Sequence, residues 1–325
     1  MASMLERFGF YIFPWGKNSP TVESLVDLAR HGEELGFDSV HLPYHLTLPT
    51  TWIFPDFGNR EIIDPLVALP AIIQGTERIR VSLNTAVLPL LNPYVWAKYL
   101  ATCDHLAKGR FIAGVAIGWW EEEFRIVEAP LSRRGRMTDE ALEVMTRLWT
   151  EDAVTFEGQF YRLDNVGLEP KPYQQPYPPV LVGGGLASAE RAAKYGTYLM
   201  PLTPTPATVR DVIKPRLTEL AERHGRDVKL ATMNYTVVSD DADWVAREVY
   251  PILQRCVGGS RADPVRPEDV AIYGNPEQCA ERARALLDAG VDYIIFDFQY
   301  HGLETEDFAR EHMRRFVEEV VPFLA

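Results

Sequence analysis

The 325-residue sequence has few cysteines and a shortage of positive charge, and both narrow its chemistry. Its three cysteines, Cys103, Cys256 and Cys279, form no CxxC pair, which argues against a disulfide framework and a thiolate zinc site. Lysine and arginine number 33 against 46 aspartate and glutamate residues, so the formal net charge is −13. A chain this acidic repels nucleic-acid phosphates and anionic lipid, so we expect neither nucleic acid nor a membrane as a partner.

Long apolar runs and several catalytic motifs are missing as well. No apolar run approaches the ~18 residues needed to span a bilayer, and no signal-peptide stretch opens the sequence. Together with unpaired cysteines, this predicts a cytoplasmic protein. The motifs HExxH, GxSxG and GxGxxG are absent, as are histidine and carboxylate clusters at metal-ligand spacing. These absences argue against a metallohydrolase, a serine hydrolase, a dinucleotide fold and any bound metal.

What the sequence does contain is an alternation of short apolar runs with segments of helical periodicity. Such alternation predicts β-α units around a parallel sheet. The eight candidate strands are Phe8–Phe13, Ser39–Leu42, Arg80–Leu88, Phe111–Ile117, Val180–Val182, Tyr198–Leu202, Lys229–Val238 and Tyr293–Phe298. Helix starts are marked by a capping side chain followed by proline, at Ser19-Pro20, Asp64-Pro65, Asn92-Pro93, Thr205-Pro206 and Asn275-Pro276.

The predicted fold class is α/β, as a single (β/α)8 TIM barrel with insertions that spans residues 1–325 as one domain. Eight strands with intervening helices need ~250 residues, so room remains for two insertions. The first, at about residues 151–179, has the pattern of a small hairpin followed by a proline-rich connector. The second, at about residues 257–272, contains Gly258-Gly259 and two prolines and is expected to be a surface loop.

Chemistry in such a barrel takes place at the carboxyl ends of the strands, and the residues expected there are aromatic and nearly uncharged. They include Trp15 after the first strand, Tyr44 and His45 after the second, Asn84 to Leu88 on the third, Trp119 after the fourth, and Tyr300 and His301 after the eighth. This lining suits a flat, partly apolar ring better than a sugar phosphate, although these aromatic rings could also simply plug the barrel mouth. His45 and His301 are the two histidines placed to bind a ligand or move a proton.

A glycine turn, Gly183-Gly184-Gly185, leads from the fifth candidate strand into a helix. Glycines allow an anion to approach backbone N–H groups, so the turn could hold a phosphate. A purely structural role for the turn is equally open at this stage. The acidic run Glu121-Glu122-Glu123 is expected to lie in solvent at a helix start.

The order and spacing of many segments resemble the bacterial luciferase-like oxidoreductases, which are flavin or deazaflavin enzymes on a (β/α)8 barrel. The likeness spans nearly the whole chain, although no single motif is decisive. The segments that carry it include Phe8 to Phe10, Glu33 to His41 (EELGFDSVH), Asn84 to Pro89 (NTAVLP), Leu100 to Leu106, Gly109 to Trp119 (GRFIAGVAIGW), Glu122 to Phe124, Arg134 to Arg136, Phe156 to Gly158, Pro170 to Pro172, Pro179 to Gly184 and Gly274 to Pro276.

The resemblance implies positions for the cofactor. In the family a non-proline cis peptide lies in a bulge on the third strand, beneath the tricyclic ring, and the matching pair is Ala86-Val87. The ring also passes the end of the fourth strand, at Gly118 and Trp119, and its phosphate or tail lies near the glycine turn. Asn84 belongs to the same third-strand motif. His45 matches a histidine seen in many members, and is the expected catalytic residue.

Tyr44 departs from the family pattern, because members often have an acidic residue or another histidine there. Trp15, Tyr44, Tyr300 and His301 are expected to contact the substrate. Two chemistries share this scaffold, and the first is favoured. In the first, reduced FMN supplied by a separate reductase reacts with oxygen to oxygenate a small organic substrate; in the second, coenzyme F420, with its own reductase, exchanges hydride without oxygen. A flavin-binding protein without enzymatic activity is a less favoured alternative, and a homo-oligomer is possible.

Overall fold

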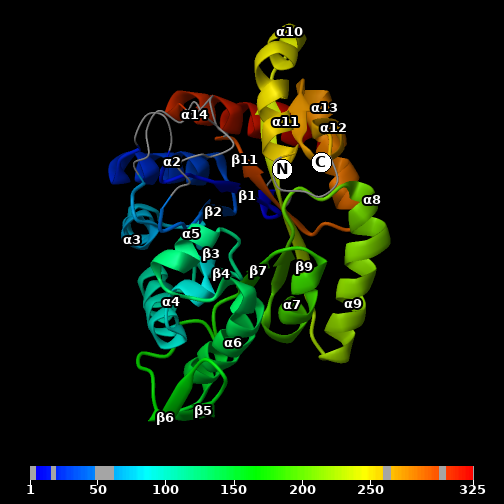
Figure 1. The fold of residues 1–325 in the computed structure, drawn as a ribbon. Coiled ribbons are helices and arrows are strands. Elements are labelled where there is room, and N and C mark those ends of the chain that lie inside the picture. The colour runs from blue at the N-terminus through cyan, green and yellow to red at the C-terminus, as the bar shows by residue number, and fades with distance from the viewer. Residues whose placement is uncertain (1–4, 16–19, 48–61, 259–264, 300–304, 325) are drawn as a thin grey trace.

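A closed barrel of parallel strands forms the centre of the protein. The structure is a computed structural model that describes residues 5–15, 20–47, 62–258, 265–299 and 305–324. The strands follow one another around the barrel in the order β11, β1, β2, β3, β4, β7, β8, β9, and pairing of β9 with β11 closes the ring. Every pair in this ring is parallel, so the carboxyl ends of the strands meet at one end of the barrel, as the predicted (β/α)8 fold requires (Figure 1).

Each predicted strand is present, with ends that differ by up to two residues. The bounds of the barrel strands are β1 Phe8–Tyr11, β2 Ser39–Leu42, β3 Arg80–Val87, β4 Phe111–Ala116, β7 Val180–Gly183, β8 Tyr198–Met200, β9 Lys229–Val238 and β11 Tyr293–Asp297. Nearly all of their residues are buried, because helices cover the outside and side chains fill the inside. The inner layer includes Tyr11, Met200 and Tyr293, and the outer layer includes Phe8 and Phe296.

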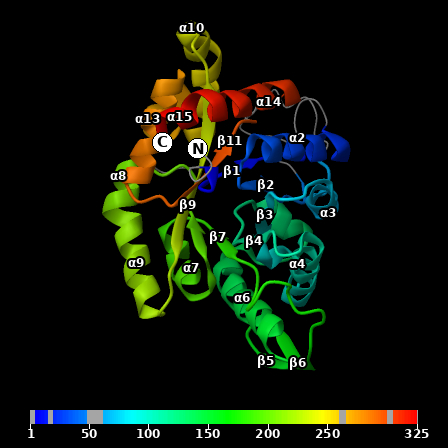
Figure 2. The same ribbon diagram turned by 180° about the vertical axis from the view of Figure 1, so that it is seen from behind.

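Helices surround the barrel. Their bounds are α2 Val22–Leu35, α3 Pro65–Gly75, α4 Pro93–Ala107, α5 Glu121–Ile126, α6 Arg134–Thr150, α7 Ala189–Tyr195, α8 Pro206–Thr208, α9 Lys214–Arg223, α10 Ala242–Trp244, α11 Tyr250–Gly258, α12 Pro267–Val270, α13 Pro276–Asp288, α14 Glu306–Arg315 and α15 Val321–Leu324. The last long helix, α14, packs on α2, which joins the two ends of the helical layer (Figure 2).

The expected cap and proline pairs start four of these helices. Side chains of Asp64, Asn92, Thr205 and Asn275 accept hydrogen bonds from backbone N–H groups in the first turn. The fifth helix start, expected at Ser19-Pro20, is wrong. The helix α2 begins at Val22, two residues after Pro20, and its cap is Thr21. Thr21 and Ser24 form a reciprocal capping box, which is a stronger start signal than the proline.

The two insertions differ in structure. In the first, β5 (Val154–Glu157) and β6 (Arg162–Val166) form an antiparallel hairpin beyond α6, followed by a connector with cis prolines at 170 and 176. The second is not simply a surface loop. Its described part contains α12 and the first residue of β10 (Ile272–Gly274), which pairs with the far end of β9. The expectation that its two prolines lie in a loop is wrong for Pro267, which begins α12, and Pro264 lies outside the described residues.

Among the described residues, we find no helix with the length and apolar character needed to cross a membrane.

Candidate active site

A bulge in β3 lies at the carboxyl end of the barrel, where the cofactor ring was expected. Leu83 pairs with Ala113 of β4 and Ala86 pairs with Val115, so Asn84 and Thr85 together face the single residue Gly114. A side chain at Gly114 would come within 2.4 Å of the Leu83 carbonyl oxygen. Glycine therefore permits the bulged backbone to lie against β4 at this place.

The non-proline cis peptide joins Asn84 and Thr85, and the prediction that it joins Ala86 and Val87 is wrong. The physical reason is the pairing register. Ala86 and Val87 have already returned to the regular ladder with β4, and the extra residue of the bulge lies before them, opposite Gly114. All four residues still belong to one short segment at the barrel mouth.

Two of the expected glycines lie directly against this segment. A side chain at Gly118, whose φ is +74°, would meet the Val87 side chain at 2.5 Å. A side chain at Gly183 would meet Thr85 at 2.9 Å. The ends of β4 and β7 therefore approach the bulge closely, and the structure brings Asn84, Ala86, Val87, Gly118 and Gly183 together.

His45 lies in a cluster of tryptophans beside this segment. Its ring centroid is 5.7 Å from that of Trp15, 6.1 Å from Trp119 and 6.4 Å from Trp120. His45 is about one-seventh exposed, at 14%. An imidazole among aromatic rings and close to solvent is suitably placed to exchange a proton with a bound ligand.

Glu123 holds His45 in place, and sequence reasoning missed it. Its Oε1 lies 3.1 Å from His45 Nδ1 and accepts a 2.7 Å hydrogen bond from the Leu46 N–H. The expectation that the acidic run is solvated is wrong for Glu123, which is 1% exposed, whereas Glu121 and Glu122 lie farther out. The next residue, Phe124, is buried as well. This large apolar residue is the one signal in the sequence that α5 faces the protein interior at Glu123 and Phe124.

The four residues expected to contact the substrate lie in different surroundings or outside the described residues. Trp15 is buried, and its backbone bridges to Ile62. Tyr44 is buried with its ring 5.4 Å from Trp96, and burial raises the pKa of its hydroxyl. Its ring therefore packs in the outer layer of the core. Tyr300 and His301 fall outside the described residues.

Three large apolar side chains remain exposed where strands end. Trp119 after β4 is 59% exposed, Leu186 after β7 is 43% exposed and Leu202 after β8 is 54% exposed. Exposed apolar groups at the mouth of a barrel are typical of a site that takes an apolar ring or substrate.

The glycine turn offers space for a ligand at one position. Gly184 has φ +129°, and a side chain there would meet Ser188 Oγ at 2.4 Å, so its role is conformational. A side chain at Gly185 would meet no atom within 4 Å. Open space beside backbone N–H groups at Gly185 is what an anionic group needs.

Two buried oxygen atoms in this region accept no hydrogen bond from any described residue: Asn84 Oδ1 and Glu123 Oε2. Buried polar atoms normally have partners, so such atoms at a cofactor site are suited to bind donors of a ligand. The apolar mouth, the glycine turn and these acceptors together fit a tricyclic ring with an anionic tail. Within the described ranges we find no group of histidine, cysteine and carboxylate side chains that could hold a metal ion.

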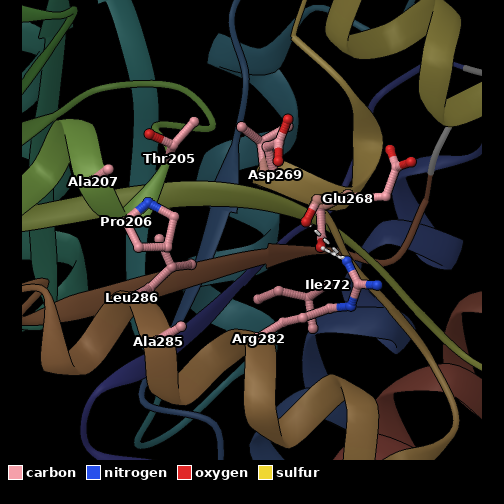
Figure 3. A pocket seen from close by; sticks show the side chains of 11 residues that line it. Thr205, Pro206, Ala207, Glu268, Asp269, Ile272, Arg282, Ala285 and Leu286 are labelled. Atoms are coloured by element: carbon pink, nitrogen blue, oxygen red, sulfur yellow. Dashed lines mark hydrogen bonds between the residues drawn. The ribbon is translucent and has the colours of Figure 1, made fainter.

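A separate cavity of about 390 Å³ lies between α8, α12, the first residue of β10 and one side of α13 (Figure 3). Thr205, Glu268 and Arg282 line it, and none of the expected site residues does. Arg282 donates to the Glu268 carbonyl oxygen at 3.1 Å, so one of its N–H groups is already used within the protein.

Comparison with known proteins identifies the family of the chain. Residues 8–293 match the family described as luciferase-like monooxygenases. The protein belongs to this family. The family description is that of a monooxygenase, and the relatives of the chain include enzymes named as FMNH2-dependent and as F420-dependent, so the chain is a member of an oxidoreductase family.

Individual relatives extend the comparison. An FMNH2-dependent dimethylsulfone monooxygenase of Pseudomonas putida is 30% identical over 288 residues, which cover 77% of each chain. A monooxygenase of Streptomyces bottropensis superposes with a TM-score of 0.82 at 24% identity, covering 98% of this chain and all of the other. An F420-dependent secondary alcohol dehydrogenase superposes with a TM-score of 0.81 at 22% identity, covering 98% and 99%. The two structural matches demonstrate the shared barrel.

Proposed function

We propose that this enzyme is a monooxygenase that uses reduced FMN and oxygen to oxygenate a small organic substrate. The observation that carries the proposal is the 30% identity to an FMNH2-dependent monooxygenase over most of both chains. An F420-dependent hydride transfer is the second candidate, favoured by a close superposition with an F420-dependent dehydrogenase. The sequence identity to that dehydrogenase is 22%, so the superposition shows a shared fold and does not identify the cofactor.

In the proposed site the ring lies on the bulge at Asn84, Ala86 and Val87, beside Gly118 and Trp119. Bound reduced FMN supplies the electrons that activate oxygen, while the protein orients the ring and limits access of water. The tryptophans around His45 provide an apolar wall. Trp15, Tyr300 and His301 remain candidates for contacts with the substrate, whereas the expected contact through Tyr44 is not part of the proposal, because its ring packs against Trp96 in the core.

We propose that His45 transfers a proton to or from the bound ligand. With Nδ1 held at the Glu123 carboxylate, the other ring nitrogen, Nε2, is directed away from Glu123. A neutral imidazole that donates through Nδ1 has Nε2 as its basic atom, and the nearby carboxylate stabilises the imidazolium formed when Nε2 takes a proton.

We also propose that a separate reductase supplies the reduced cofactor, that the enzyme works in the cytoplasm, and that the whole chain forms one domain. The absence of the GxGxxG dinucleotide motif from the sequence supports the proposal of a separate reductase. Association into a homo-oligomer is part of the proposal and is checked by the mass in solution.

The deciding experiment is an anaerobic titration of the apoprotein with FMN, photoreduced FMN and F420, followed by oxygen. We expect saturable binding of reduced FMN at one per chain, and consumption of oxygen when a substrate is present. Saturation by F420 alone would favour hydride transfer. Binding of oxidised FMN without turnover of any substrate would favour a flavin-binding role, and no saturable binding would reject all three.

A substitution at Gly185 tests whether the glycine turn binds the phosphate of FMN. Gly185→Val introduces a β-branched side chain into open space at φ −83°, so we expect a folded protein with an unchanged melting temperature. Binding of FMN should weaken about tenfold or more, because hydrogen bonds to a charged group are lost. Riboflavin, which lacks the phosphate, is the matched control ligand and should bind both proteins equally.

If Gly185→Val binds FMN as tightly as the original protein, the phosphate lies at another loop. Gly184→Val is the contrasting variant. It forces a valine into φ +129° against Ser188, so we expect it to lower the melting temperature as well.

A further inference from the structure

A chain of buried side chains runs through the barrel interior from the bulge to the amino ends of the strands. Asn84 Nδ2 is 3.0 Å from His41 Nδ1, and His41 Nε2 is 2.6 Å from Ser39 Oγ. Ser39 Oγ is 2.6 Å from the Tyr293 hydroxyl, which donates to Asp38 Oδ2 at 2.6 Å. Ser39 and His41 are fully buried, while Asn84 is 3% and Tyr293 5% exposed. Apart from Asn84, none of these side chains takes part in the proposed binding of the ring or in the proposed proton transfer.

The far end of the chain is a charged pair. Arg80 donates from Nε to Asp38 Oδ2 at 3.0 Å and also from its terminal nitrogen. The pair is partly exposed, with side-chain exposures of 29% for Arg80 and 20% for Asp38. An ionised carboxylate only accepts hydrogen bonds, so Asp38 fixes the direction of the bond that it receives.

The direction of each bond then follows in turn. Tyr293 donates its one proton to Asp38, so it accepts from the Ser39 hydroxyl. Ser39 has then used its proton and accepts from His41 Nε2–H. A neutral imidazole with its proton on Nε2 has a bare Nδ1, which accepts from the Asn84 NH2 group. The reverse direction would place two acceptor oxygens without a proton between Tyr293 and Asp38.

His41 stays neutral in this chain. Burial, together with the charge of Arg80, lowers the pKa of His41 to about 3. The neighbouring strand leaves room for the contact, because a side chain at Gly9 of β1 would come within 2.4 Å of Ser39 Oγ and 3.0 Å of His41 Nε2. The interior is therefore shaped around these bonds.

The chain ends at Asn84 in the candidate site, where it fixes which atom of the amide faces which partner. The Asn84 amide nitrogen is occupied by His41 and by Met200 Sδ at 3.4 Å, and its carbonyl oxygen, Oδ1, is the buried atom without a described partner. We propose that the Asp38-anchored chain holds Asn84 with Oδ1 toward the bound cofactor, so that Asn84 accepts from an N–H group of the tricyclic ring. Asp38, Tyr293, Ser39 and His41 are thus positioning residues that act through Asn84. The inference rests on the proposed binding of a ring at the bulge.

Single-atom changes far from the ring test this inference. Ser39→Ala and Tyr293→Phe each break the chain and allow the Asn84 amide to turn. Binding of the cofactor that saturates the original protein (FMN, reduced FMN or F420) should weaken about three- to tenfold, as expected for one hydrogen bond. Tyr198→Phe is the matched control, because Tyr198 lies in the same interior layer, 6.0 Å from the Tyr293 ring, and outside the chain.

A spectroscopic readout does not depend on the cofactor. In ¹⁵N-histidine NMR, His41, assigned by its loss in His41→Gln, should carry its proton on Nε2. Loss of affinity in Ser39→Ala and Tyr293→Phe but not in Tyr198→Phe, with this tautomer, supports the inference.

Unchanged affinity in the folded chain variants, an equal loss in Tyr198→Phe, or a proton on Nδ1 would overturn the inference while leaving the proposed function intact. Failure of the original protein to bind any of the three cofactors would instead overturn the proposed function, and with it the role of Asn84.

Discussion

Replacement of His45 by alanine is expected to lower the rate of substrate turnover by about 10²–10⁴-fold, the usual contribution of a general acid or base. His45 is partly exposed and packs by ring contacts at the barrel mouth, so its loss should change the melting temperature little. Steady-state kinetics with the true substrate and a melting curve measure the two effects separately. Near-normal turnover in a folded His45→Ala protein would transfer the proton-moving role to another residue at the mouth.

Glu123→Gln separates positioning from chemistry. The glutamine still accepts from the Leu46 N–H but no longer places a carboxylate beside His45 Nδ1, so we expect a smaller loss of turnover than in His45→Ala. Glu122→Gln is the matched control. Glu122 is the preceding residue of α5 and pairs with Arg125 in solvent, so its replacement should leave turnover unchanged. Equal effects of the two substitutions would contradict a specific role for Glu123.

The free energy of unfolding should fall as the pH is lowered below neutral. Burial lowers the pKa of His41 to about 3 and that of His312 to about 4, whereas an unfolded chain protonates histidine near ~6.5. Below ~6.5 the unfolded state therefore binds protons that the native state does not, and stability decreases toward acid pH. For two such groups the loss between pH 7 and 5.5 is about 2 to 3 kcal/mol.

Urea unfolding at pH 7 and pH 5.5 measures this loss. His41→Gln removes one of the two groups and should reduce the loss to about half, while the dependence between pH 7 and 8 stays flat in both proteins. An unchanged pH dependence in His41→Gln would mean that His41 is protonated in the native state, which would also contradict the tautomer inferred for the interior chain.

The barrel was predictable because each of its strands is buried on both faces and stands out as a short apolar run. Phe8–Tyr11 and Tyr293–Asp297 illustrate this, since every residue in them is buried. The strand Ile272–Gly274 was missed because its first residue falls in the stretch at about residues 257–272 that was expected to be a loop, and its pairing with the end of β9 comes from the fold.

The details of the site depended on contacts between distant segments. The bulge falls at Asn84 and Thr85 because Gly114 of the next strand leaves room for it, and nothing within the third strand itself marks that place. Glu123 differs from its two acidic neighbours only in facing the loop after β2. The interior chain joins residues from β2, β3 and β11, so its existence follows from the closed barrel and not from any local motif.

A crystal structure of the protein with FMN bound would show whether the cofactor binds at the bulge. We expect the tricyclic ring against the Asn84 to Val87 bulge, an N–H of the ring at hydrogen-bond distance from Asn84 Oδ1, and the phosphate at the Gly183 to Gly185 turn. His45 should face the ring or the space above it. Density for FMN in the cavity lined by Thr205, Glu268 and Arg282, with an empty bulge, would contradict the proposed cofactor site.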